Sequence, residues 1–255
     1  MRIACVLFGQ PRHYVTGHKN IRHFFQNQNS NVQVDFFYHC WTLNANDTYK
    51  VSPWQKIDPS CLQYENNIPN HLLELYNPIR YEYENQSNMT LDESMYKHTL
   101  VYNQTDELQK KNINNTLFQV YSRNKARNIL DNYIKETNTI YDFVIMTRFD
   151  IGNLLTFDLN LLDRSNTYIS KSHYPRKIMP DLFFIIPVNV FLAWFTIYDS
   201  LSDMLNNENI ITKVSHFGEK LVINPEELIF GKYISLFENL NKICYIKYKY
   251  SICNR

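Results

Sequence analysis

Glycine is scarce in this sequence. The 255 residues contain 5 glycines, where average usage gives roughly 18. Their positions allow no G-x-G-x-x-G, no G-x-x-x-x-G-K-[ST] and no G-x-S-x-G motif anywhere in the chain. Dinucleotide-binding fingerprints, phosphate-binding P-loops, kinase loops and the nucleophile elbow of α/β-hydrolases are therefore excluded.

Cysteines and long apolar runs are also sparse. The 5 cysteines are widely spaced and never form C-x-x-C, so we expect neither a disulfide framework nor a cysteine-rich zinc site. The longest apolar stretch, 182–195, is too short to span a membrane and is interrupted by Pro187 and Asn189. Residues 1–8 are too short for a signal peptide. These absences predict a cytoplasmic protein with no transmembrane segment.

Charge of neither sign dominates. Lys and Arg together number 26 and Asp and Glu 25, which gives a formal net charge of +1. Without an excess of basic residues the chain has no extended positive electrostatic field to hold a nucleic acid, so we expect no nucleic acid partner. An anionic ligand would have to be bound by a local group of charges. The hydrophobic content of 44% is that of a globular domain.

Apolar runs and helical periodicities alternate along the chain. Runs at 2–8, 32–38 and 141–147 predict buried strands, and spaced apolar residues between 117 and 134 predict a helix. Further elements are expected as strands at 167–170, 182–186 and 243–250, a helix at 190–205, and a helix begun by Pro225. This alternation predicts an α/β fold whose ligands lie beyond the carboxyl ends of parallel strands.

One segment breaks the alternation. Residues 43–115 are polar and Asn-rich, with weak periodicity, and contain a Tyr-rich stretch near 79–83 that predicts a short strand. We expect a single domain over residues 1–255, in which 43–115 is an insertion or a lid-like region.

The first candidate for chemistry follows the strand at 141–147. Arg148 and Asp150 place a cation and a hard oxygen ligand at one sheet edge, which suits a diphosphate and a divalent cation. An ion pair at a strand end, with no ligand, explains the same residues. On the preceding helix, Arg123 and Arg127 share one face, which is either solvated or faces phosphate.

Two other strands carry polar residues. The turn 8–12, with the sequence FGQPR, either cradles a base or diphosphate with its amides and side chains or is a plain Gly-Pro turn. In the second strand, Asp35 and His39 either meet a nucleoside at the same edge or belong to a core that contains a buried histidine and Trp41.

Three acidic residues are candidates for proton transfer. Asp181 immediately precedes the apolar strand at 182–186, near the floor of the expected cleft, where it serves as a general base or caps a turn. Glu226 and Glu227 follow Pro225 in the first turn of a helix, a place where capping and the helix dipole already favour acids.

Taken in order, these segments resemble a family of GT-A-type glycosyltransferases found in large DNA viruses, phages and bacteria. The matching segments span nearly the whole chain and are 1–12, 34–41, 141–150, 181–184 and 225–227. The resemblance implies a GT-A-like (Rossmann-like) three-layer α/β fold with a mixed, mostly parallel sheet. It also implies a UDP- or GDP-linked nucleotide sugar as donor and an Asp-x-Asp-like element that holds Mn²⁺ or Mg²⁺ against the diphosphate.

In this sequence Arg148-Phe149-Asp150 occupies the place of that element, so the last acid matches and the first is an arginine. The site therefore either binds the metal through Asp150, with His216 as a further candidate ligand, or uses Arg148 and other cations instead. The donor-binding residues implied by the resemblance are Phe8, Gly9, Gln10, Arg12, Asp35, Arg123, Arg127, Arg148 and Asp150. The catalytic candidates are Asp181, which is preferred, and Glu226 and Glu227.

Several classes of function stay open. The leading one is a glycosyltransferase that moves a sugar from a nucleotide sugar to a hydroxyl of a glycan, protein or small-molecule acceptor, with an inverting or a retaining outcome. The second is a non-catalytic nucleotide-sugar-binding protein on the same fold. The third is a structural or interaction module whose aromatic residues, 15% of the chain, serve partner contacts. A nucleotidyl- or phosphotransferase is disfavoured by the lack of a Gly-rich loop or clustered acids.

Overall fold

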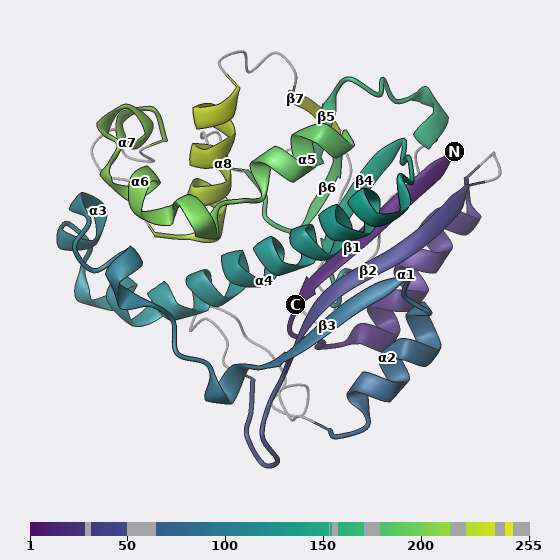
Figure 1. The fold of residues 1–255 in the computed structure, drawn as a ribbon, viewed down its shortest axis with the longest axis horizontal. Helices are drawn as coiled ribbons and strands as arrows, with labels where there is room; N and C mark the ends of the chain where they lie inside the picture. Colours follow the sequence, from purple (N-terminus) through teal and green to yellow (C-terminus); the bar gives the residue numbers. More distant parts are fainter. Residues whose placement is uncertain are drawn as a thin grey trace.

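The computed structural model describes residues 1–28, 32–49, 65–152, 154, 158–170, 179–214, 223–237 and 243–246. Within these ranges one seven-stranded sheet forms the centre of the molecule, in the order β3-β2-β1-β4-β6-β5-β7 (Figure 1). Its strands are β1 (Arg2–Gly9), β2 (Gln33–Thr42), β3 (Arg80–Asn85), β4 (Phe143–Arg148), β5 (Thr167–Ser170), β6 (Phe183–Ile186) and β7 (Ile243–Ile246).

In this sheet, β6 runs against the other strands. β1 is parallel to β2 and β4, β2 is parallel to β3, and β5 is parallel to β7, whereas β6 is antiparallel to both β4 and β5. The pairing of Thr147 with Phe183 puts the start of β6 beside the end of β4. Residues just before β6 therefore reach the same sheet edge as residues just after β1 and β4.

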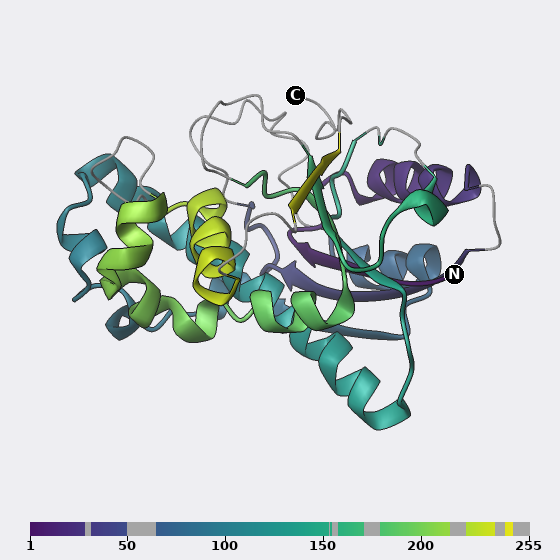
Figure 2. The ribbon, with the colours of Figure 1, turned by 90° about the horizontal axis from the view of Figure 1, so that it is seen from above.

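Helices cover both faces of the sheet, as the two views in Figures 1 and 2 show. One layer contains α1 (Tyr14–Gln26) and α2 (Ile68–Tyr76), and the other contains α4 (Glu107–Thr137) and α5 (Val188–Trp194). The side chains of β1 alternate between the two layers: Ile3 and Leu7 join the core that includes α1 and α2, while Val6 and Phe8 join the core that includes α4 and α5. A strand that is apolar on both sides is typical of a parallel sheet between helical layers.

A group of short helices lies on the side toward which β1 and β2 run (Figures 1 and 2). It consists of α3 (Leu100–Asn103), α6 (Leu201–Asn206), α7 (Glu208–Val214) and α8 (Pro225–Leu236). α8 contacts α4, so the beginning of α8 is brought toward the carboxyl edge of the sheet. Single 3₁₀ turns occur as η2 (Gln86–Asn88), η3 (Glu93–Met95), η4 (Leu159–Leu161) and η5 (Tyr198–Ser200).

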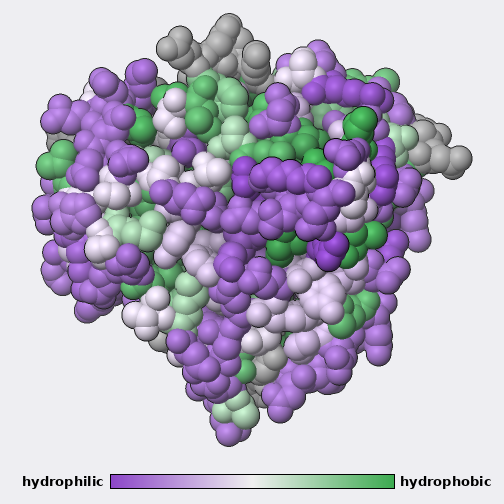
Figure 3. Space-filling view, viewed as in Figure 1, coloured by the Kyte–Doolittle hydropathy of each residue, from purple (hydrophilic) through white to green (hydrophobic). Residues whose placement is uncertain are grey.

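α4 begins earlier than its apolar pattern predicts. Its first residue is Glu107 rather than 117, because the side chain of Asp106 caps the helix by accepting a hydrogen bond from the amide of Gln109 at 2.8 Å. The inner side of α4 buries apolar residues together with Ser122 and Arg123. The outer surface of the molecule on this face is mostly hydrophilic (Figure 3).

The structure corrects the expected helix at 190–205, which is divided into α5, η5 and α6. Trp194 and Phe195 both pack against Phe184, each with 5.6 Å between ring centroids. Side chains of consecutive residues in a straight helix point about 100° apart. A helix that ends at Trp194 makes it easier for both rings to turn toward Phe184, so this shared contact favours a break after Trp194.

Two elements of the segment 43–115 belong to the central layers of the fold. Its α2 packs against α1, and its β3 forms the edge of the central sheet beside β2. The sequence hides this role, since the residues of β3 are half-buried or exposed and alternate tyrosine with glutamate. The last expected strand is described as far as Ile246, and residues 247–250 lie outside the described part of the chain.

The strand order, the reversed β6 and the two helical layers confirm the expected three-layer α/β class with a mixed, mostly parallel sheet. Among the described residues, every helix is too short or too polar to cross a membrane.

Candidate functional site

Charged side chains from five elements converge at the carboxyl edge of β1 and β4. Arg12 follows β1, Arg148 and Asp150 stand at the end of β4, Asp181 precedes β6, Arg123 lies on α4 and Glu226 opens α8. We call these six residues the arginine site. Because parallel strands present their carboxyl ends to ligands, this edge is the first place to look for function.

Asp150 lies between two arginines in this site. Arg148 donates to both of its oxygens, from Nε to Oδ1 at 2.9 Å and from Nη2 to Oδ2 at 2.6 Å, and Arg12 Nη2 donates to Oδ2 at 3.3 Å. The side chain of Asp150 is 2% exposed. Burial by itself would lower the pKa of Arg148, but the charges of Asp150, Asp181 and Glu226 and the hydrogen bond to Asp150 together outweigh it, and the pKa is raised. Arg148 is therefore held as a cation against Asp150.

Arg123 and Asp181 form the second pair. Arg123 Nη2 donates to the backbone oxygen of Asp181 and lies 3.6 Å from its Oδ2, which also accepts from Gln119 Nε2 at 2.5 Å. The guanidinium carbon of Arg123 is 4.4 Å from the centre of the Phe8 ring, a cation–π contact. Burial lowers the pKa of Arg123 to about 10, and the charge of Asp181 opposes that shift. Arg123 thus stays a cation at neutral pH.

Glu226 has an unusual pKa for a carboxyl group. Burial and the negative charge of Asp181 raise it to about 7, while Arg123 and Arg148 act in the opposite direction. α8 is capped by Asn224, whose side chain accepts from the amide of the next acid, Glu227, at 2.8 Å, and the Glu227 side chain is buried. Glu226 is therefore the group of this site that can gain or lose a proton near neutral pH.

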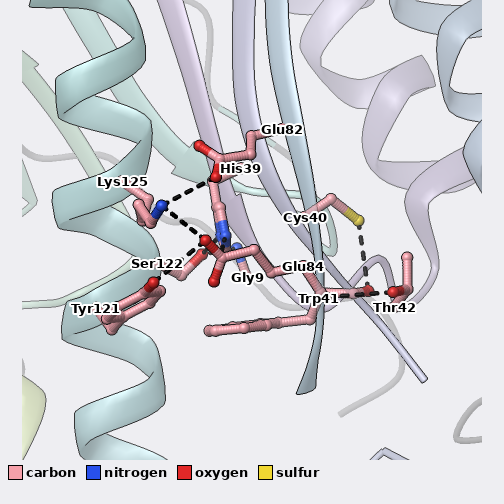
Figure 4. A network of polar contacts seen from close by, with 10 residues as sticks. All are labelled: Gly9, His39, Cys40, Trp41, Thr42, Glu82, Glu84, Tyr121, Ser122 and Lys125. Carbon is pink, nitrogen blue, oxygen red and sulfur yellow. Dashed lines mark hydrogen bonds and ion pairs between the residues drawn. The ribbon is translucent and has the colours of Figure 1, made fainter. Parts of the chain in front are cut away.

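The turn after β1 is fixed by α4. Gly9 has a φ of +96°, and its amide donates to Ser122 Oγ at 2.8 Å. The same oxygen lies 2.7 Å from Nδ1 of His39, which is fully buried (Figure 4). Burial lowers the pKa of His39, so the ring is neutral at pH 7. The carboxylate of Glu84 lies near Nε2 and favours the tautomer that carries the ring proton on Nε2. His39 is thus a core residue that supports the turn.

A charged network extends from His39 to the edge strand (Figure 4). Glu84 on β3 accepts from Tyr121 at 3.2 Å and pairs with Lys125 at 2.7 Å, and Lys125 also pairs with Glu82 at 2.9 Å. Burial by itself would raise the pKa of Glu84, but the nearby His39 and the bonds from Lys125 and Tyr121 lower it strongly. This network joins α4 to β2 and β3 and holds the carboxyl edge together.

Two residues expected at the donor, Asp35 and Arg127, lie outside the arginine site. Asp35 lies near the beginning of β2, where Arg2 Nε and the Tyr141 hydroxyl each donate to it at 2.8 Å. The beginning of a parallel strand is at the sheet edge opposite the arginine site, so Asp35 does not join it. Arg127 donates to the backbone oxygen of Leu192 at 2.8 Å and pairs with Asp131 at 2.9 Å.

Gln10 bonds Gln86 at 3.0 Å, across the turns that follow β1 and β3. His216 lies outside the described residues.

The sequence analysis named Arg123 but missed two other residues of α4 that organise this edge, Gln119 and Ser122. The three have the i, i+3, i+4 spacing of one helix face: Gln119 contacts Asp181 before β6, and Ser122 and Arg123 contact the end of β1. The signal that was available is the presence of polar residues inside an apolar helical stripe.

The carboxylates of the site do not suit a divalent cation. Mg²⁺ and Mn²⁺ favour several oxygen ligands, and the described part of the chain contains no group of three or more His, Cys, Asp or Glu side chains placed to bind a metal. Both oxygens of Asp150 already accept from guanidinium groups. A cation at Asp150 would have to displace arginines and then face their charge.

No family model matches the chain, and no curated protein matches its sequence. Among solved structures, the crystal structure of an active-site mutant of LgtC overlaps 96% of this chain and 72% of that chain, with a TM-score of 0.43 and 8% identity. An overlap at this level carries no information on activity or on site residues. The class defined by the strand order and the helical layers is the α/β class described above.

Proposed function

We propose that this protein is a glycosyltransferase that uses a nucleotide sugar. The observation that carries the proposal is the convergence of Arg12, Arg123 and Arg148 with Asp181 and Glu226 at the carboxyl edge of β1 and β4. Guanidinium groups suit a diphosphate leaving group, and a carboxylate with a pKa near neutrality suits an acceptor proton. The resemblance to GT-A-type enzymes in the ordered segments supports the same assignment, with UDP- or GDP-linked sugars as the first donors to test.

In the proposed reaction, the bond between the sugar anomeric carbon and the β-phosphate oxygen breaks, and a bond from that carbon to an acceptor oxygen forms. The proton of the acceptor hydroxyl passes to a carboxylate, and the nucleoside diphosphate leaves with the bonding electron pair. Arginine side chains neutralise the charge that develops on the diphosphate. The acceptor is a hydroxyl of a glycan, a protein or a small molecule, and the proposed location is the cytoplasm.

Between the two carboxylates, we assign proton acceptance to Glu226. The Oδ2 atom of Asp181 is held by Gln119 and faces Arg123, which suits a group that orients the donor sugar or the acceptor. The pKa of Glu226 near 7 allows it to be ionised and still basic at working pH. Activity is then expected to rise with pH through about 7, as Glu226 loses its proton.

The test is the release of the nucleotide from a panel of donor sugars: nucleoside diphosphate from UDP-, GDP- and TDP-linked sugars, and CMP from CMP-linked sugars. Glu226→Gln is expected to lower the rate by about 100-fold or more and to remove the rise in rate near pH 7, with donor binding retained. The matched control is Glu74→Gln on the exposed side of α2, which is expected to behave as wild type. Binding of a donor without turnover would indicate a non-catalytic binding protein, and no binding at all would indicate an interaction module.

A further inference from the structure

Arg123 has hydrogen-bonding capacity that the described protein groups do not use. The residue is 1% exposed, and its Nε and Nη1 atoms have no hydrogen-bond partner in the described part of the chain. A buried donor without a partner costs free energy, and guanidinium N–H groups are strong donors to phosphate oxygens. The two unused donors of Arg123 therefore point to an anionic ligand.

The turn after β1, next to Arg123, has open space. A β-carbon added at Gly9 would contact nothing within 4 Å, so the turn after β1 is open on that side. Gly9 is bonded to Ser122, the neighbour of Arg123, and Phe8 lies beneath the guanidinium. A phosphate at the end of β1 would thus approach both the open turn and the unused N–H groups.

The charges of the site suit an anion better than a cation. Arg12, Arg123 and Arg148 contribute three positive charges, and Asp150 and Asp181 two negative ones. Glu226 adds a negative charge only when it is ionised. With Glu226 protonated the site has an excess of positive charge, and Asp150, which occupies the expected metal position, already accepts from two of the arginines.

We infer that the arginine site binds the diphosphate of a nucleotide through Arg123 and Arg148 and that this binding needs no divalent cation. The identity of the ligand as a nucleoside diphosphate rests on the proposed function. The independence from metal rests on the bonding of Asp150 and on the two unused donors of Arg123.

The experiment is a calorimetric titration of the full-length chain with UDP, GDP and inorganic pyrophosphate, each in EDTA and in excess Mn²⁺. We expect at least one nucleotide and pyrophosphate to bind in EDTA, with affinities that change by less than about twofold when Mn²⁺ replaces the chelator. Binding that appears only with Mn²⁺, or that Mn²⁺ strengthens tenfold or more, would overturn the inference and leave the proposed function standing. Absence of binding in both conditions would overturn both.

Two variants separate the arginine edge from general charge. Arg123→Lys keeps the charge but removes the planar edge, and it is expected to weaken pyrophosphate binding tenfold or more in EDTA. The matched control is Arg127→Lys on the same helix, whose guanidinium bonds Leu192 and Asp131 outside the site, and it is expected to bind as wild type. If circular dichroism shows that Arg123→Lys does not fold, Arg148→Lys takes its place. Wild-type affinity in the folded variant contradicts the inference.

Discussion

The carbonyl oxygen of Phe149 occupies the place where a side chain on residue 17 would begin. A β-carbon built on Gly17 of α1 would lie 1.7 Å from this oxygen. One turn later, Asn20 Nδ2 donates to the carbonyl of Ile151 at 3.1 Å. α1 therefore fixes the backbone on both sides of Asp150, and the glycine at position 17 allows the close approach.

Gly17→Ala is expected to lower the free energy of unfolding by roughly 1–3 kcal/mol or more, because the obstructing atom belongs to the backbone and cannot rotate away. Urea denaturation measures the change. The control is Thr16→Ala on the exposed side of the same helix, for which a change within about 0.5 kcal/mol is expected. Equal stability of Gly17→Ala and wild type would show that α1 does not fix the position of the backbone around Asp150.

Ser122→Ala removes a hydroxyl that serves two buried groups at once. The amide of Gly9 and Nδ1 of His39 both lose their partner, so we expect a loss of about 1–3 kcal/mol and weaker binding of pyrophosphate, because the turn after β1 is no longer anchored. Ser202→Ala, at a partly exposed site with a long contact of 3.4 Å to His98, is the control. The idea fails if both variants unfold at the same urea concentration.

The raised pKa of Glu226 predicts a specific dependence of stability on pH. Its ordinary value is 4.5 and its folded value is about 7, so between these values the folded protein holds a proton that the unfolded chain has released. Stability should therefore fall as the pH rises through this window and level off above it.

Glu226→Gln removes the cost of burying this charge. The variant is expected to be more stable than wild type at pH 8, with a difference that shrinks toward pH 4, as measured by thermal unfolding across that range. Glu74→Gln, at an exposed position, should follow the wild-type curve. If stability depends on pH in the same way in Glu226→Gln and in wild type, the carboxyl group of Glu226 is exposed to solvent and its pKa is not raised.

Asp150→Asn leaves the guanidinium groups of Arg12 and Arg148 without their counter-charge. Breaking a buried ion pair costs roughly 3–5 kcal/mol, so a clear loss of thermal stability is expected, whereas Asp47→Asn at an exposed site should have little effect. Pyrophosphate in EDTA should raise the melting temperature of Asp150→Asn more than that of wild type, since a bound anion replaces the missing charge. A rise that requires Mn²⁺ in wild type and vanishes in Asp150→Asn would identify Asp150 as a metal ligand instead.

The strands were predictable where burial on both sides leaves a continuous apolar run, as in β1 and β4. β3 was harder, because an edge strand of half-buried and exposed tyrosines and glutamates has no such run, although its position was recognised. Within the site, Arg148 and Asp150 are neighbours in sequence, so their pairing could be anticipated.

The contact between Gly9 and Ser122 could not be anticipated, since it joins residues 113 positions apart and depends on how α4 crosses the sheet. The position of Asp35 could not be anticipated for a related reason. A sequence shows that a polar residue belongs to a strand, but which end of the sheet it reaches depends on its place within the strand, and Asp35 is near the beginning of β2.

The place of β1 between β2 and β4 also affects how the chain folds during synthesis. β1, α1 and β2 form a local unit that can assemble early, but the backbone of Arg2 meets its partner Asp142, at the start of β4, only after 140 further residues. Until then one edge of an apolar central strand has no neighbour, and an unpaired apolar edge favours wrong pairing with other chains. The slow and aggregation-sensitive stage of folding should therefore be the arrival of β4, the same strand that delivers Arg148 and Asp150.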